Sequence, residues 1–136
     1  MPTEIGFVEA FKKFSAKLDN PNWAVSAISE KGEFVLSCWS QYFERGDIGV
    51  LRYVDCLSRW TGNNAGNNLL RSHLVKAHSE ALPVRLIIAT AEKPEEIETV
   101  SDASKIKKKF NVREDVVGRV TLFDGDNFVI EYRATP

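Results

Sequence analysis

The chain has 136 residues, of which 43% are hydrophobic and 27% are charged, and this size and composition are typical of one globular domain. The formal net charge of −1 excludes a strongly basic protein that binds nucleic acid through total charge alone. The longest nearly apolar run, Leu86 to Ala91, is too short to cross a bilayer, and the first residues lack a secretory signal, so we expect a single domain over residues 1–136, no membrane partner and a cytoplasmic location.

The first predicted element is an amphipathic helix from Ile5 to Leu18, in which apolar residues recur at helical spacing. A turn over residues 19–22 ends it, because Pro21 disfavours helical geometry in the residue before it. Two segments rich in β-branched and aromatic residues follow, Trp23 to Ser29 and Glu33 to Trp39. A glycine lies between them, so they predict a β-hairpin.

Residues 41–47 are expected to form a connection to a third strand, Val50 to Leu57. Each cysteine lies in a predicted buried strand, Cys38 in the second and Cys56 in the third. We therefore expect two reduced thiols in the core.

Two Gly-Asn-Asn units stand four residues apart at positions 62–64 and 66–68. We interpret them as a loop that leads into a second amphipathic helix, from about Asn67 to Ala81, which Pro83 closes. The inward stripe of this helix is predicted to contain Leu70, His73 or Leu74, Ala77 and Ala81.

The second half of the chain begins with a short strand, Val84 to Ala89, whose apolar run indicates a central strand covered on both faces. Two helices are expected next, from Pro94 to Val100 and from residue 101 or 102 to Phe110. The chain then predicts a hairpin in which turn residues 124–127 join strands Val116 to Phe123 and Phe128 to Arg133. This order of elements predicts an α+β fold with a mostly antiparallel, curved or partly barrel-like sheet and helices packed on one face.

The loop that contains the Gly-Asn-Asn units is the strongest candidate for a binding site. Backbone N–H groups at a helix start favour an anion, arginines stand on both sides of the loop, and an asparagine amide can pair with a base edge. The alternative is structural, with the glycines in left-handed turns and Asn64 or Asn67 as a helix cap. The predicted ligand-binding residues are Arg59, Trp60, Asn63, Asn64, Asn67, Asn68, Arg71 and Lys76.

The remaining sequence patterns do not identify a binding or catalytic site. The lysines of residues 105–109 are interpreted as either phosphate contacts or a solvated helix face. His73 and His78 are five residues apart, which is poor spacing for one metal site on a helix. No Walker loop, dinucleotide fingerprint, zinc spacing or nucleophile elbow is present, so we assign no cofactor, no metal and no catalytic residue.

Three functions follow from these observations. The first is a non-enzymatic binding module that recognises a nucleic acid or a nucleotide-like anion through the Asn-rich loop and the adjoining helix N-terminus. The second is a small hydrolase or transferase for a phosphorylated or nucleoside substrate, in which His73 or His78 carries a proton and Asp55 or Asp115 orients it. The third is an interaction or regulatory domain that forms a homodimer through an exposed strand edge.

Overall fold

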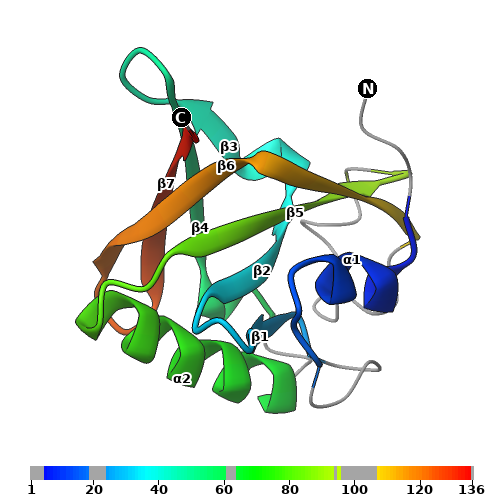
Figure 1. Cartoon of the computed structure of the whole chain (residues 1–136), viewed down its shortest axis with the longest axis horizontal. Coiled ribbons are helices and arrows are strands. Elements are labelled where there is room, and N and C mark those ends of the chain that lie inside the picture. The colour runs from blue at the N-terminus through cyan, green and yellow to red at the C-terminus, as the bar shows by residue number, and fades with distance from the viewer. Residues whose placement is uncertain (1–4, 19–23, 61–63, 94, 96–106, 136) are drawn as a thin grey trace.

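The computed structural model describes residues 5–18, 24–60, 64–93, 95 and 107–135 (Figure 1). Within these ranges the structure contains two α-helices, two short 3₁₀ helices and seven strands. In chain order the elements are α1 (Phe7–Lys13), β1 (Ser26–Ile28), β2 (Phe34–Trp39), the 3₁₀ helix η1 (Ser40–Tyr42), β3 (Phe43–Arg45), β4 (Val50–Cys56), the 3₁₀ helix η2 (Leu57–Trp60), α2 (Asn64–Ser79), β5 (Val84–Ala91), β6 (Lys108–Phe123) and β7 (Asn127–Ala134).

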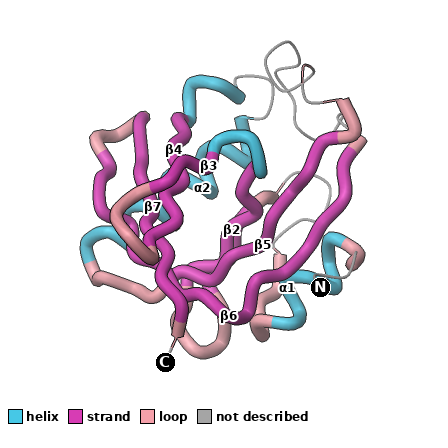
Figure 2. The backbone as a smooth tube through the Cα atoms, turned by 90° about the horizontal axis from the view of Figure 1, so that it is seen from above, coloured by secondary structure: helices cyan, strands magenta, loops and turns pink. Residues whose placement is uncertain are grey.

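The seven strands form one sheet in the order β1-β2-β5-β6-β7-β4-β3. Only β2 and β5 pair in parallel, and every other neighbouring pair is antiparallel. The predicted α+β class with a mostly antiparallel sheet is therefore confirmed. The sheet curves strongly (Figure 1 and Figure 2), but it ends at β1 and β3 and does not close into a barrel.

The long strand β6 makes much of this curvature. Its first part pairs with β5 and its last part pairs with β7. The register of the β5 pairing shifts, since Val84 lies opposite Gly118 whereas Leu86 lies opposite Arg113. Such an irregularity bends a strand and increases its twist. At Gly118 an added Cβ atom would lie 2.6 Å from Cδ1 of Tyr132, so only glycine lets the two strands approach this closely.

The main core fills the concave side of the curved sheet. Its buried residues come from β2, β4, β5, β6, β7 and one side of α2. The largest fully buried side chains in this cluster are Tyr53, Tyr132, Phe34, Phe128 and Leu36. Strands on opposite sides of the curve meet across it, because the Tyr53 hydroxyl in β4 accepts a hydrogen bond of 3.1 Å from the backbone N–H of Trp39 in β2.

A second, smaller core lies under α1. It contains Phe11 of α1 together with Val35 of β2 and Ile87 of β5. The adjacent residues of the same strands, Leu36 after Val35 and Leu86 before Ile87, belong to the main core beside α2. Because successive residues of a strand point to opposite faces, α1 and α2 pack on different faces of β2 and β5. The expected packing of the helices on one face is therefore not confirmed, whereas the prediction of β5 as a central strand covered on both faces is confirmed.

The first helix is shorter than predicted. It ends at Lys13, where Phe14 takes the C-cap position and Ser15 adopts a positive φ of 58°. The backbone N–H of Ala16 then bonds to the carbonyl of Phe11, which closes the helix end. Phe14, Ala16 and Leu18 nevertheless remain buried, so their apolar spacing serves the core without continuing the helix.

Both hairpins and the strand over residues 50–56 are confirmed, with shifted ends. Two other predictions are wrong. Residues 41–47 contain the short strand β3 in addition to a connection. The expected helix through Phe110 is contradicted at its end, because Lys108 to Phe110 form the start of β6 and pair with β5. Residue 107 is not helical either, whereas residues 96–106 lie outside the described residues.

Candidate anion-binding site

Helix α2 begins at Asn64, three residues before the predicted start. Residues 66–68, the second Gly-Asn-Asn unit, therefore belong to the helix and not to a loop. Gly66 is buried, and the half-buried Asn67 donates a hydrogen bond of 2.7 Å from Nδ2 to the carbonyl oxygen of Leu57. This bond joins the first turn of α2 to η2. It gives Asn67 a structural role, but not the expected one of a helix cap, because Asn67 lies inside α2 and Gly66 is helical without a positive φ.

Other predicted residues lie on the exposed side of α2. Asn68, Arg71 and Lys76 are exposed, as are Ser72 and Val75 between them. Their spacing places them on one broad face of a 3.6-residue helix, opposite the buried Leu70, Leu74 and Ala77. The expected inward stripe is thus confirmed except at Ala81, which follows the helix, is exposed and has a positive φ of 52°.

The two cations of this face have different surroundings. Lys76 donates to Glu80, with Nζ 3.0 Å from Oε2, one helical turn further along. Arg71 makes no ion pair or hydrogen bond within the described part of the chain. Helix α2 itself contains no Asp or Glu, and its first turn has no acidic residue to neutralise the N-terminal end of the dipole. Helix α2 therefore contributes no negative charge to the surface around Asn68 and Arg71.

The remaining predicted residues lie at or before the helix start. Arg59 and Trp60 form the end of η2, and Asn64 is the first residue of α2. Asn63 lies outside the described residues. The backbone thus places η2 and the first turn of α2 side by side through the Asn67–Leu57 bond.

The two histidines differ in burial. His73 is half-buried, with Nδ1 2.8 Å from the hydroxyl oxygen of the buried Ser26 and its ring beside Phe34. His78 is exposed in the last turn of α2. The Ser26–His73 contact joins helix α2 to strand β1. A serine that is 1% exposed has no access to a substrate, so the contact is one of packing.

The carboxylates expected to orient a histidine have partners of their own. Asp55 accepts a 2.7 Å hydrogen bond from the Tyr53 hydroxyl and a 2.8 Å bond from the backbone N–H of Cys56. Asp115 forms two hydrogen bonds of 2.8 and 2.9 Å with Arg113, and this guanidinium lowers the pKa of the Asp115 carboxyl. Both carboxylates thus stabilise local structure.

A buried polar network crosses the main core near Asp55. Burial raises the pKa of the Tyr53 hydroxyl, and the negative charge of Asp55 raises it further. Burial likewise raises the pKa of the Cys38 thiol, whose sulfur lies 3.5 Å from the Tyr132 hydroxyl. Both cysteines are free, but only Cys38 is fully buried, so the prediction of two core thiols is wrong for the half-buried Cys56.

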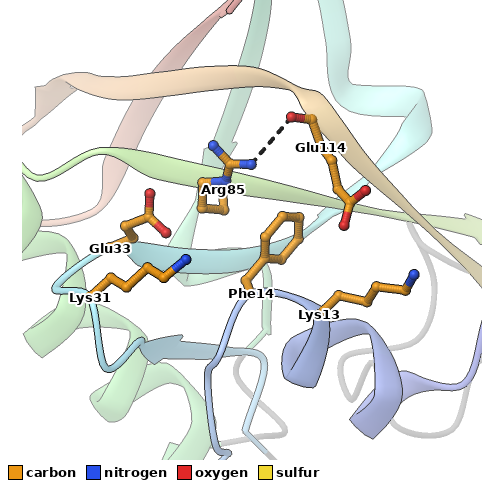
Figure 3. A pocket seen from close by; sticks show the side chains of 6 residues that line it. All are labelled: Lys13, Phe14, Lys31, Glu33, Arg85 and Glu114. Carbon is orange, nitrogen blue, oxygen red and sulfur yellow. Dashed lines mark hydrogen bonds between the residues drawn. The ribbon is translucent and has the colours of Figure 1, made fainter.

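A hollow of about 270 Å³, which no sequence pattern predicted, lies on the α1 side of the sheet. Its lining comes from α1, the β1–β2 turn, β5 and β6, and none of the residues predicted to bind a ligand contributes to it. The lining residues are Lys13, Phe14, Lys31, Glu33, Arg85 and Glu114 (Figure 3). They come from four segments that are far apart in the sequence, and only the topology of the sheet brings these segments together, so no local pattern could have revealed them.

Neither helix of the described residues is long and apolar enough to span a membrane. Comparison of the chain with protein-family models, with curated proteins and with solved structures finds no match. The arguments for a function therefore rest on the side chains and their geometry.

Proposed function

We propose that this protein is a non-enzymatic binding domain that recognises a nucleic acid or a nucleotide-like anion through the exposed face of α2. The observation that carries the proposal is Arg71, an exposed cation on a helix without acidic residues and with no ion pair in the described part of the chain. Surface arginines that bind no carboxylate of their own are available to bind a phosphate through two parallel N–H donors.

The neighbours of Arg71 suit such a contact. Asn68 lies one turn before it and carries an amide that both donates and accepts hydrogen bonds. Ser72 is exposed beside it, although its hydroxyl donates to the carbonyl of Leu69 at 2.8 Å. Lys76 borders the face and contributes less, because Glu80 already neutralises its ammonium. Asn68 and Arg71 are therefore the centre of the proposed contact.

The proposal extends to the residues before the helix. Arg59, Trp60, Asn63 and Asn64 lie within a few residues of the start of α2, and the N–H groups of a helix start favour a phosphate. In this proposal Arg59 adds a phosphate contact, Trp60 stacks on a base, and the asparagines read its edge. Asn67 is left out of the proposed contact because its amide donates to the Leu57 carbonyl.

The test is binding of fluorescent single-stranded DNA and RNA by anisotropy at low salt. The variant that carries both Asn68→Ala and Arg71→Gln is expected to weaken binding about tenfold, the size of one charge-assisted contact. Lys12→Gln is the matched control, since it removes one exposed positive charge from α1, far along the chain and paired only weakly with Glu9 at 3.8 Å. Equal affinity of the double variant, the Lys12→Gln control and the wild type would remove the proposal.

A further inference from the structure

The hollow on the α1 side of the sheet gathers three cations from three elements. Lys13 ends α1, Lys31 lies in the turn between β1 and β2, and Arg85 lies in β5. Within the described residues, none of the three forms an ion pair. Like charges that share a small hollow repel one another, and an anion placed among them removes that repulsion.

Arg85 is held in a fixed orientation between the two sides of the hollow. Its Nη2 donates to the backbone carbonyl of Glu114 at 3.2 Å, and its guanidinium carbon lies 5.0 Å from the centre of the Phe14 ring (Figure 3). Phe14 is 5% exposed and serves as a rigid floor under the guanidinium. Because the Glu114 carbonyl is neutral, the charge of Arg85 is not cancelled by this contact.

Two carboxylates complete the lining. Figure 3 shows Glu33 beside Lys31 on one side of Phe14, and Glu114 with Lys13 on the other side. With three cations and two carboxylates, the lining has a formal charge of +1. The two carboxylates oppose a long polyanion and can accept hydrogen bonds from hydroxyl or amino groups of a small molecule.

We propose that this hollow binds the phosphoryl group of a small phosphorylated molecule that also carries hydroxyl groups. A phosphate monoester has three acceptor oxygens, whereas a carboxylate has only two, so it can accept hydrogen bonds from Arg85 and Lys31 together, while Lys13 on the other side of Phe14 adds positive charge to the lining. Glu33 and Glu114 accept hydrogen bonds from the hydroxyl groups. The volume of about 270 Å³ limits the ligand to a few non-hydrogen atoms beyond the phosphoryl group. This site is separate from the α2 face and does not depend on its function.

The test is titration of the full chain at low ionic strength with glycerol phosphate, inorganic phosphate and acetate, followed by amide chemical shifts. Glycerol phosphate is expected to bind more tightly than inorganic phosphate, and acetate more weakly than either. Lys31→Gln and Lys13→Gln are each expected to weaken binding of glycerol phosphate about threefold to tenfold. Glu33→Gln is expected to strengthen it about twofold to fivefold, because it removes a like charge from the site.

Lys12→Gln is the matched control, because Lys12 precedes Lys13 on α1 but does not line the hollow. It should bind glycerol phosphate as the wild type does, and so should Arg71→Gln on α2. The proposal is overturned if the wild type does not bind glycerol phosphate, if acetate binds equally well, or if Lys12→Gln weakens binding as much as Lys31→Gln. Lys31 is exposed in a turn, so its replacement leaves the fold intact and the comparison interpretable.

Discussion

The side-chain amide of Asn67 donates a hydrogen bond of 2.7 Å to the carbonyl oxygen of Leu57, and this bond joins the first turn of α2 to the end of β4 through η2. It separates two roles within one asparagine-rich segment. Asn67 holds the helix start against the sheet, whereas its neighbour Asn68 faces outward. Asn67 therefore stabilises the helix start on which Asn68 is exposed.

Alanine substitutions at Asn67 and Asn68 should therefore lower the free energy of unfolding by different amounts. Asn67→Ala leaves the Leu57 carbonyl, on a residue that is 1% exposed, without the amide, and should lower the free energy of unfolding by about 1–2 kcal/mol. Asn68→Ala removes an exposed amide and should change it by less than about 0.5 kcal/mol. Urea unfolding of both variants measures the difference. Equal losses of stability in the two variants would show that the Asn67–Leu57 hydrogen bond does not stabilise the fold.

The hydroxyl of Tyr53 should matter more than that of Tyr132. Tyr53 both accepts from the Trp39 N–H and donates to Asp55, so Tyr53→Phe removes two buried hydrogen bonds and should lower the free energy of unfolding by about 2–3 kcal/mol. The contact described for the Tyr132 hydroxyl is a 3.5 Å approach to the Cys38 sulfur, so Tyr132→Phe should lower it by less than about 1 kcal/mol. Thermal or urea unfolding of both variants measures the two losses of stability. A larger loss for Tyr132→Phe than for Tyr53→Phe would contradict the hydrogen bonds assigned to Tyr53.

The two thiols should differ in reactivity. Burial raises the pKa of the Cys38 thiol far above neutral pH, so it stays protonated and shielded in the folded protein. Cys56 is only half-buried, so we expect a reagent to reach it. A thiol reagent at pH 8 should therefore modify one cysteine in the native protein and both in urea, and Cys56→Ser should remove the native reaction. Rapid modification of two cysteines under native conditions is the contrary result.

The Arg113–Asp115 pair predicts a small dependence of stability on acid pH. Arg113 lowers the pKa of Asp115 in the folded protein, so the pair contributes stability above the ordinary Asp pKa of about 3.9 and loses it as the pH falls through the lower, folded-state value. Because the pair is largely exposed, the contribution should stay below about 1 kcal/mol. Asp115→Asn should be less stable than the wild type at pH 7 and equal to it near pH 2, as measured by urea unfolding. The same difference at both pH values would argue against this linkage.

Elements with strong local signals could be predicted from the sequence. The β6–β7 hairpin follows from its turn residues, and the structure shows why: Asp124 accepts hydrogen bonds from the backbone N–H groups of Asp126 and Asn127. The central strand β5 follows from its apolar run. In both places, local preference and tertiary packing agree.

The wrong predictions of secondary structure fall on segments whose conformation is determined by tertiary contacts. Asparagine and glycine indicated a loop up to residue 66, but residues 64–66 are helical, with Gly66 buried and the helix start held by the Asn67–Leu57 bond. Lys108 reads as a solvated helix position, yet it lies in β6 opposite Ala91, with its ammonium over the Trp39 ring. Only part of the candidate site could be predicted from the sequence. The inward stripe of α2 followed from helical spacing, whereas the hollow required the sheet topology.

The salt dependence of single-stranded DNA binding tests the central claim most directly. Each phosphate contact releases counterions, so the logarithm of the binding constant falls with the logarithm of salt in proportion to the number of contacts. If Arg71 binds a phosphate, Arg71→Gln should reduce the magnitude of that slope by about one contact's share, roughly 0.7, while Lys12→Gln leaves it unchanged. An identical slope for the wild type and Arg71→Gln would show that the exposed face of α2 does not bind the nucleic acid.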